Sequence, residues 1–158
     1  MAAELMGRTD TGSRLIAATP DRLYRAHVDP VDLAAWRAPE GMRGEIIEFD
    51  ARPGGVYRMA LIYEDGVTAG KSGGGADVFE GRFLALEPGR RIVETVEFES
   101  EDPAFAGTMT ITTTFAAADG GTLVSVACAD VPPGISKSDH QAGIASSLAN
   151  LARRVEAS

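Results

Sequence analysis

The sequence predicts an α+β fold in which a curved antiparallel β-sheet wraps around one long C-terminal helix. Three observations predict it. Two short helical segments follow a first strand, a run of strand-like segments joined by turns fills the middle, and residues 138–157 form the best amphipathic helix. Strands that follow one another through short turns pair as an antiparallel meander. One face of such a sheet must then be covered by another element.

The N-terminal part predicts one strand and two short helices. Residues 8–17 contain Leu, Ile and several Ser and Thr residues, which fit a strand. Thr19 is a predicted N-cap, and Pro20 suits the first helical position. This helix is expected to end near residue 28, before an Asp-Pro pair. A second short helix is predicted over 31–36.

The middle of the chain predicts six further strands. Tyr57, Met59, Leu61 and Tyr63 alternate at period two and share one face of their strand. Turns rich in Gly and Pro separate the strands, and the Gly-rich segment 66–76 is a longer loop. The predicted strands are 45–49, 56–63, 78–86, 91–99, 109–115 and 122–129.

The C-terminal helix is predicted over 138–157. Ser138 is the expected N-cap, with Gln141 completing a capping box. The apolar stripe consists of Ile144, Leu148, Leu151 and Val155, and one turn earlier it reaches His140. A helix of this length is about 30 Å long and can cover the sheet. A curved sheet on a single helix leaves space between them, which is a candidate ligand cavity.

Composition excludes several classes of function. The chain has 158 residues, which fits one domain over 8–157 with an N-terminal tail at 1–7. Fifteen Lys and Arg against 23 Asp and Glu give a net charge of −8, the wrong sign for a nucleic-acid or anionic-membrane binder. One Cys and two His residues, without clustered carboxylates, predict no disulfide and no metal site.

The sequence predicts a cytoplasmic protein. No apolar run approaches the roughly 18 residues of a membrane span, so no membrane insertion is expected. The first eight residues lack the basic and apolar regions of a signal peptide. A homodimer is compatible with the sequence.

No cofactor is predicted. Residues 70–72 read Gly-Lys-Ser, like the end of a phosphate-binding P-loop, but that motif needs a Gly at position 65, which is Asp65. The loop is also followed by glycines and a strand rather than by a helix. A nucleotide site is therefore not expected.

Several sequence segments resemble those of the START-like (SRPBCC) superfamily, and within it the Hsp-90 ATPase activator homologue-like group. They are ATPDRLYRA at 18–26, FDARPGGVYR at 49–58, GRFLALEP at 81–88, GTLVSV at 121–126, PPGI at 132–135, DHQAG at 139–143 and SLANL at 147–151. The resemblance covers about residues 8–157. It implies a helix-grip fold, a seven-stranded antiparallel sheet gripping the C-terminal helix. Related proteins include binders of small hydrophobic molecules, polyketide cyclases and co-chaperones, so fold alone does not fix function.

Glu94 and the two histidines are the ambiguous polar residues. The period-two neighbours of Glu94 are apolar, so it is either a carboxylate in the cavity or, if the other sheet face is inward, a surface residue. His140 either bonds a ligand at the cavity mouth or is a solvated first-turn residue. His27 either faces the cavity or is a satisfied, half-buried residue. Cys128 is expected to be structural.

Three functions remain open. The first is binding of a small hydrophobic ligand, aromatic, polyketide or lipid-like, with Tyr63, Glu94 and His140 setting polar specificity. The second is a cyclase- or hydrolase-like enzyme, which needs an acid/base pair near the ligand; no catalytic residue is assigned. The third is a co-chaperone-like interaction domain, although the co-chaperone's separate N-terminal domain has no counterpart here. The predicted ligand-binding residues are Trp36, Tyr57, Met59, Leu61, Tyr63, Glu94, Val96, Phe98, Met109, Ile111, Val124, Val126, His140, Ile144, Leu148 and Leu151.

Overall fold

Seven strands form one antiparallel sheet in the order β1-β7-β6-β5-β4-β3-β2. The structure is a computed structural model, and it describes residues 7–156. The strands are β1 (Arg8–Ile16), β2 (Met42–Glu48), β3 (Val56–Tyr63), β4 (Ala76–Glu87), β5 (Arg91–Phe98), β6 (Met109–Ala118) and β7 (Gly121–Val131). The predicted α+β fold, with a seven-stranded sheet around a C-terminal helix, is confirmed.

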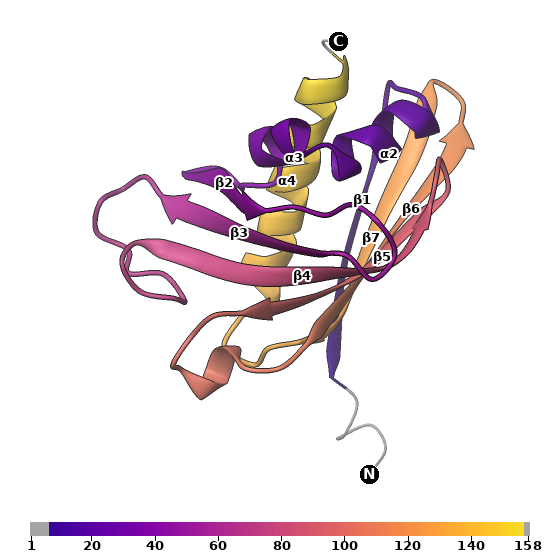
Figure 1. Cartoon of the computed structure of the whole chain (residues 1–158). Helices are drawn as coiled ribbons and strands as arrows, with labels where there is room; N and C mark the ends of the chain where they lie inside the picture. The colour runs from indigo at the N-terminus through magenta and orange to yellow at the C-terminus, as the bar shows by residue number, and fades with distance from the viewer. Residues whose placement is uncertain (1–6, 157–158) are drawn as a thin grey trace.

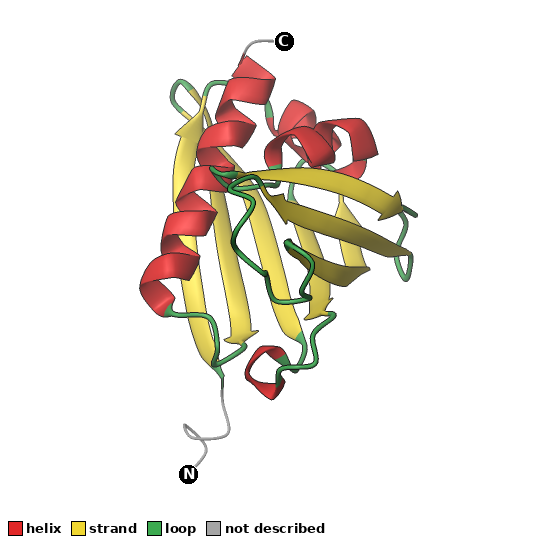
Figure 2. Cartoon of the chain, turned by 90° about the vertical axis from the view of Figure 1, so that its left-hand side faces the viewer, coloured by secondary structure: helices red, strands yellow, loops and turns green. Residues whose placement is uncertain are grey.

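The sheet is strongly curved around its C-terminal helix. In Figure 1, β1 and β7 run from top to bottom of the picture, whereas β3 and β4 run from side to side. The long helix α4 (Lys137–Glu156) lies on the concave side, as Figure 2 shows. The short helices α2 (Pro20–Val28) and α3 (Pro30–Trp36) lie beside the C-terminal end of α4. Three helices and one sheet face therefore enclose the core.

Helix α4 makes its closest approach to the sheet at β1. A Cβ atom built on Gly12 would lie 2.6 Å from Cγ2 of Ile144, closer than real side-chain atoms approach. A glycine at this position lets the helix rest directly on the first strand. The helix is thereby fixed over β1, at one edge of the sheet.

The helix starts are set by three capping side chains. Oγ1 of Thr19 accepts a hydrogen bond from the Arg22 amide (3.1 Å), as predicted. Asp29 caps α3 by accepting from the Val31 amide (2.8 Å), so that helix begins at Pro30. The prediction of Ser138 as the cap of α4 is wrong. The helix begins at Lys137, and Oγ of Ser136 accepts from the Asp139 amide (3.1 Å).

Strand ends differ from the prediction where pairing extends them. The strand predicted over 45–49 begins at Met42, because Met42 pairs with Tyr63 at the far end of β3. Strands β6 and β7 run up to the turn between Ala118 and Gly121, which face each other. A short 3₁₀ helix, η1 (Pro103–Phe105), lies between β5 and β6. The predicted tail at 1–7, apart from residue 7, and the predicted helix end at 157 lie outside the described residues.

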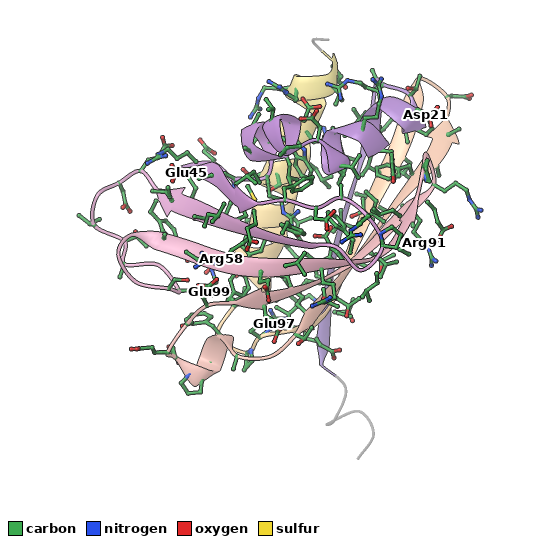
Figure 3. The ribbon with its side chains drawn as sticks, in the orientation of Figure 1. Asp21, Glu45, Arg58, Arg91, Glu97 and Glu99 are labelled. Atoms are coloured by element: carbon green, nitrogen blue, oxygen red, sulfur yellow. The ribbon has the colours of Figure 1, made fainter. Side chains whose placement is uncertain are left out.

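The convex face of the sheet is charged. Arg58 on β3 pairs with Glu80 of β4 in register and donates from its guanidinium to Glu99 (2.6 Å). Figure 3 shows Arg58 and Glu99 close together, with Glu97 nearby. Among the described helices, none is long and apolar enough to cross a membrane. The apolar side chains instead gather between the concave face and the helices.

Candidate functional site

A cavity of about 520 Å³ lies between α4 and the concave face of the sheet. This volume falls within the range of roughly 300–1,000 Å³ that small-molecule sites occupy. Its wall is mostly apolar, with a few polar side chains from the sheet, from the end of α3, from the loop 64–75 and from the first turns of α4.

Most of the predicted ligand-binding residues lie in this wall. The sheet contributes residues from four of its strands, α3 contributes its last residue, and α4 contributes the N-terminal part of its predicted stripe. The predicted residues found in the wall are Trp36, Leu61, Tyr63, Glu94, Val96, Phe98, Met109, Ile111, Val126, His140, Ile144 and Leu148.

Two predicted residues on β3, Tyr57 and Met59, do not line the cavity. Both are fully buried behind the wall. The Tyr57 ring packs between Phe79 and Phe83, with centroid distances of 6.0 and 5.1 Å. The Met59 side chain packs under α3, where its Cε would meet a Cβ on Gly44 at 2.7 Å. The strong curvature at β3 brings these side chains into the aromatic core instead of the cavity.

Val124 and Leu151 were also predicted to line the cavity, and they do not. Both are fully buried at the end of the molecule where α2 and α3 lie. Val124 pairs with Phe115, whose ring contacts His27 of α2 at 5.2 Å. The short helices therefore fill this end of the space between sheet and helix, and their residues His27 and Trp36 bound the cavity on that side.

Glu94 points inward and belongs to a buried polar cluster. Its side chain is 4% exposed and lies 3.7 Å from the guanidinium of Arg37. The Tyr57 hydroxyl donates a hydrogen bond to its Oε1. Burial, and then the adjacent carboxylate, raise the pKa of Tyr57, so the phenol stays protonated. The surface alternative for Glu94 is therefore excluded in this structure.

Arg37 holds this cluster at the end of α3. Its guanidinium stacks 5.5 Å from the centroid of the Phe79 ring, and the residue lines the cavity. Burial opposes its charge, but Tyr57 and Glu94 outweigh that effect and raise its pKa. No pattern in the sequence singles out Arg37 as a site residue. Its position directly after a predicted short helix carries no signal that its side chain turns inward.

A second polar cluster lies at the first turn of α4. Nδ1 of His140 is 2.7 Å from Oδ2 of Asp10 on β1, whose side chain is fully buried. Arg8 donates to both oxygens of the same carboxylate (2.9 Å each). Burial raises the pKa of Asp10, but the hydrogen bonds from Arg8 and His140 outweigh it and lower that pKa. The carboxylate is therefore ionised at neutral pH, and the imidazole donates to it through Nδ1.

A third polar cluster closes the cavity on the side of the Gly-rich loop. Nζ of Lys71 lies 2.9 Å from Oδ2 of Asp77, which also accepts from the Tyr63 hydroxyl (2.9 Å). The ammonium faces the rings of Phe98 and Phe105 at 5.1 and 5.6 Å. The lysine of the Gly-Lys-Ser sequence is thus held by a carboxylate.

His27 and Cys128 also reach the cavity. Nδ1 of His27 donates to the Leu23 carbonyl (2.8 Å), and burial lowers the pKa of His27 to about 4. Burial raises the pKa of the Cys128 thiol to about 12, so it is not an activated nucleophile. Within residues 7–156 no group of three or more His, Cys, Asp or Glu side chains could hold a metal ion.

Comparisons with known proteins identify the family. A family model described as activator of Hsp90 ATPase homolog 1-like protein matches residues 17–156. A protein from Chromobacterium violaceum, known from a crystal structure, is 36% identical in sequence to this chain. The two structures superpose with a TM-score of 0.83 over 94% of this chain and 96% of that one. The solution structure of an AHSA1-like protein from Aeromonas hydrophila is 22% identical, with a TM-score of 0.71 over 95% of this chain and 93% of that one, and shows the same fold.

The search of curated proteins found no match. The family model nevertheless spans almost all described residues, and the Chromobacterium protein exceeds 30% identity over nearly its full length. The resemblance read from the sequence is confirmed: the chain belongs to the family of activator of Hsp90 ATPase homolog 1-like proteins, of the SRPBCC type.

Proposed function

We propose that the protein binds a small hydrophobic molecule, aromatic, polyketide or lipid-like, in the cavity between α4 and the sheet. One observation carries the proposal. The cavity of about 520 Å³ is lined mainly by apolar side chains and has few polar groups, the usual composition of a small-molecule site. A core residue such as Met109 is 3% exposed, so what faces this space is withdrawn from bulk solvent.

The experiment is a thermal-shift screen against aromatic polyketides, flavonoids and lipids, followed by native mass spectrometry of the hits. A ligand present at about a hundredfold excess over its Kd stabilises the folded state by about 2.7 kcal/mol. We expect stabilisation by at least one of these classes, with a one-to-one complex in the mass spectrum. No stabilisation by any of them would contradict the proposal.

A matched pair of variants on β7 locates the site. Val126 lines the cavity, whereas Leu123 on the same strand is 40% exposed on the opposite face. Val126→Trp fills the cavity and is expected to abolish ligand-induced stabilisation. Leu123→Trp adds the same side chain on the outer face of the sheet and is expected to leave the ligand-induced stabilisation unchanged.

A cyclase- or hydrolase-like activity is the second candidate, and the polar clusters favour it. Glu94 has a second titratable group, Tyr57, within hydrogen-bond reach, and His140 is oriented by a buried carboxylate. An oriented imidazole at a cavity wall can act as a general base. If the screen finds a ligand with a hydrolysable or enolisable carbonyl, we expect turnover in the wild type and its loss in His140→Asn with binding retained.

A further inference from the structure

The charged side chains around the cavity are arranged in compensated pairs. Arg37 lies 3.7 Å from Glu94, and Lys71 lies 2.9 Å from Asp77. The remaining charged side chain in the wall is Asp139, which is exposed at the mouth. An anion entering this mostly apolar space would lose its hydration without meeting a cation that lacks a carboxylate partner, and a cation would meet only the hydrated carboxylate of exposed Asp139. The wall therefore favours an uncharged molecule.

Arg37 retains hydrogen-bond donors for such a molecule. A guanidinium carries five N–H donors. Within residues 7–156 its side chain meets Tyr57 and Glu94 as polar partners, and these two groups occupy only part of that capacity. Since Glu94 already balances the charge, Arg37 is suited to donate to a neutral acceptor such as a ketone or ester carbonyl.

His140 offers the opposite chemistry. Its Nδ1 donates to Asp10, so the neutral imidazole presents Nε2 as an acceptor. No group among the described residues bonds Nε2, and every fully buried side-chain nitrogen or oxygen among them has a partner, so Nε2 is an accessible atom. His140 lines the cavity, whereas Asp10 lies behind it. A hydroxyl group of a ligand can donate to this nitrogen.

The carboxylate partners of the two anchors, Asp10 and Glu94, lie on one row of the sheet. Asp10 pairs with Cys128, Cys128 with Ile111, and Ile111 with Glu94. The row crosses three strand spacings, which places the Cα atoms of Asp10 and Glu94 about 14 Å apart. Cys128 and Ile111, which lie between them, both line the cavity. An apolar surface therefore separates the acceptor His140 from the donor Arg37.

Building on the proposed function, we propose that the cavity selects an uncharged ligand with an apolar body, a carbonyl group that accepts from Arg37 and a hydroxyl group that donates to Nε2 of His140. The ligand lies over Cys128 and Ile111. Its carbonyl meets the Arg37–Glu94 pair, and its hydroxyl meets the Asp10–His140 pair.

Four benzophenone derivatives of nearly equal size test this selection. The reference probe is para-hydroxymethylbenzophenone, which is uncharged and carries both groups. The para-methyl compound lacks the hydroxyl, para-benzylbenzyl alcohol lacks the carbonyl, and benzophenone-para-carboxylate carries a charge. Their Kd values are measured by displacement of the neutral dye N-phenylnaphthylamine.

We expect the reference probe to bind at least about fivefold more tightly than either compound that lacks one polar group, the effect of one hydrogen bond. The carboxylate is expected to bind at least tenfold more weakly, because of its uncompensated charge. Equal or tighter binding of the carboxylate would overturn the inference while leaving the proposed function intact. If the dye binds and none of the four displaces it, the ligand class is wrong. If the dye itself does not bind, the proposed function fails as well.

Two variants assign the preferences to their residues. His140→Asn keeps an N–H donor near the position of Nδ1, which preserves the contact with Asp10, and removes Nε2. It is expected to bind the hydroxymethyl and methyl probes equally. Arg37→Lys keeps the charge beside Glu94 but loses the planar set of donors, and is expected to reduce the preference for the carbonyl compound. Retention of both preferences in folded variants, checked by circular dichroism, would contradict the assignment.

Discussion

The Tyr57 hydroxyl on β3 reaches the Glu94 carboxylate on β5 by passing over Gly81 of the intervening strand β4. Tyr57 and Gly81 pair directly in register, and Gly81 also pairs with Val96, two residues from Glu94. A Cβ on Gly81 would lie 2.1 Å from Cε1 of the tyrosine ring. The absence of a side chain at Gly81 therefore allows the ring to cross the strand, and this contact sets the orientation of the carboxylate at the cavity wall.

Gly81→Ala is expected to destabilise the protein because the added methyl group overlaps the Tyr57 ring. Overpacking of this kind costs about 1–3 kcal/mol. Gly143 is the matched control, since it lies in α4 and nothing lies within 4 Å of an added Cβ. Gly143→Ala is expected to stabilise the helix by up to about 1 kcal/mol. Chemical denaturation of both variants measures the two effects, and equal free energies of unfolding would contradict this role of Gly81.

Removal of the Tyr57 hydroxyl leaves the buried Glu94 carboxylate with one hydrogen-bond donor fewer. Tyr57→Phe is therefore expected to lower the free energy of unfolding by about 1–3 kcal/mol. Tyr24→Phe is the control, because no described group bonds the Tyr24 hydroxyl and its ring packs edge-on to Phe115 at 6.5 Å. A change within about 0.5 kcal/mol is expected there. If the two variants are equally stable, the contact between Tyr57 and Glu94 does not contribute to stability.

His27 gives the fold a defined dependence on pH. Burial lowers its pKa to about 4 in the folded state, from the ordinary value of 6.5. The unfolded chain therefore binds more protons between these two values, and the stability that depends on neutral His27 is lost as pH falls from about 6.5 to about 4. The loss across this range is on the order of 3 kcal/mol.

His27→Phe should flatten that dependence. The ring lies between Trp36 (4.7 Å) and Phe115 (5.2 Å), so an aromatic replacement keeps the stacking and removes the titration. Urea unfolding at several pH values measures the slope for both proteins. The pKa of the Asp10 carboxylate is lowered from 3.8, so its contribution to the pH dependence of stability lies below the pH range in which His27 titrates. Identical slopes for the two proteins between pH 6.5 and pH 4 would show that His27 is not the group responsible.

The sequence was sufficient for the architecture because the relevant signals are local. Turn residues, period-two strands and the stripe from Ile144 to Val155 each depend on nearby residues. The N-cap of α4 was misplaced by two residues because Ser136 and Ser138 both suit that position, and it is Ser136 that accepts from the Asp139 amide. Asp10 was not singled out, because its partner His140 lies 130 residues away.

The site was predicted where alternation alone decides which side chains face the helix. The prediction of the cavity-lining side chains failed where the curvature of the sheet decides. Tyr57 and Met59 share the alternation of Leu61 but lie behind the wall. Arg37 and Lys71 enter the cavity from a helix end and a loop, which have no period from which a direction could be deduced. Glu94 could be placed only once the register of β5 with its neighbours was known.

A fluorescence titration with N-phenylnaphthylamine on the wild type, Val126→Trp and Leu123→Trp tests most directly whether the cavity between α4 and the sheet is the ligand site. We expect saturable fluorescence enhancement at one site in the wild type and in Leu123→Trp, and its loss in Val126→Trp, whose added ring occupies the cavity. Circular dichroism checks that all three proteins are folded. Undiminished binding to folded Val126→Trp, or no saturable binding to the wild type, would contradict the claim that this cavity is the ligand site.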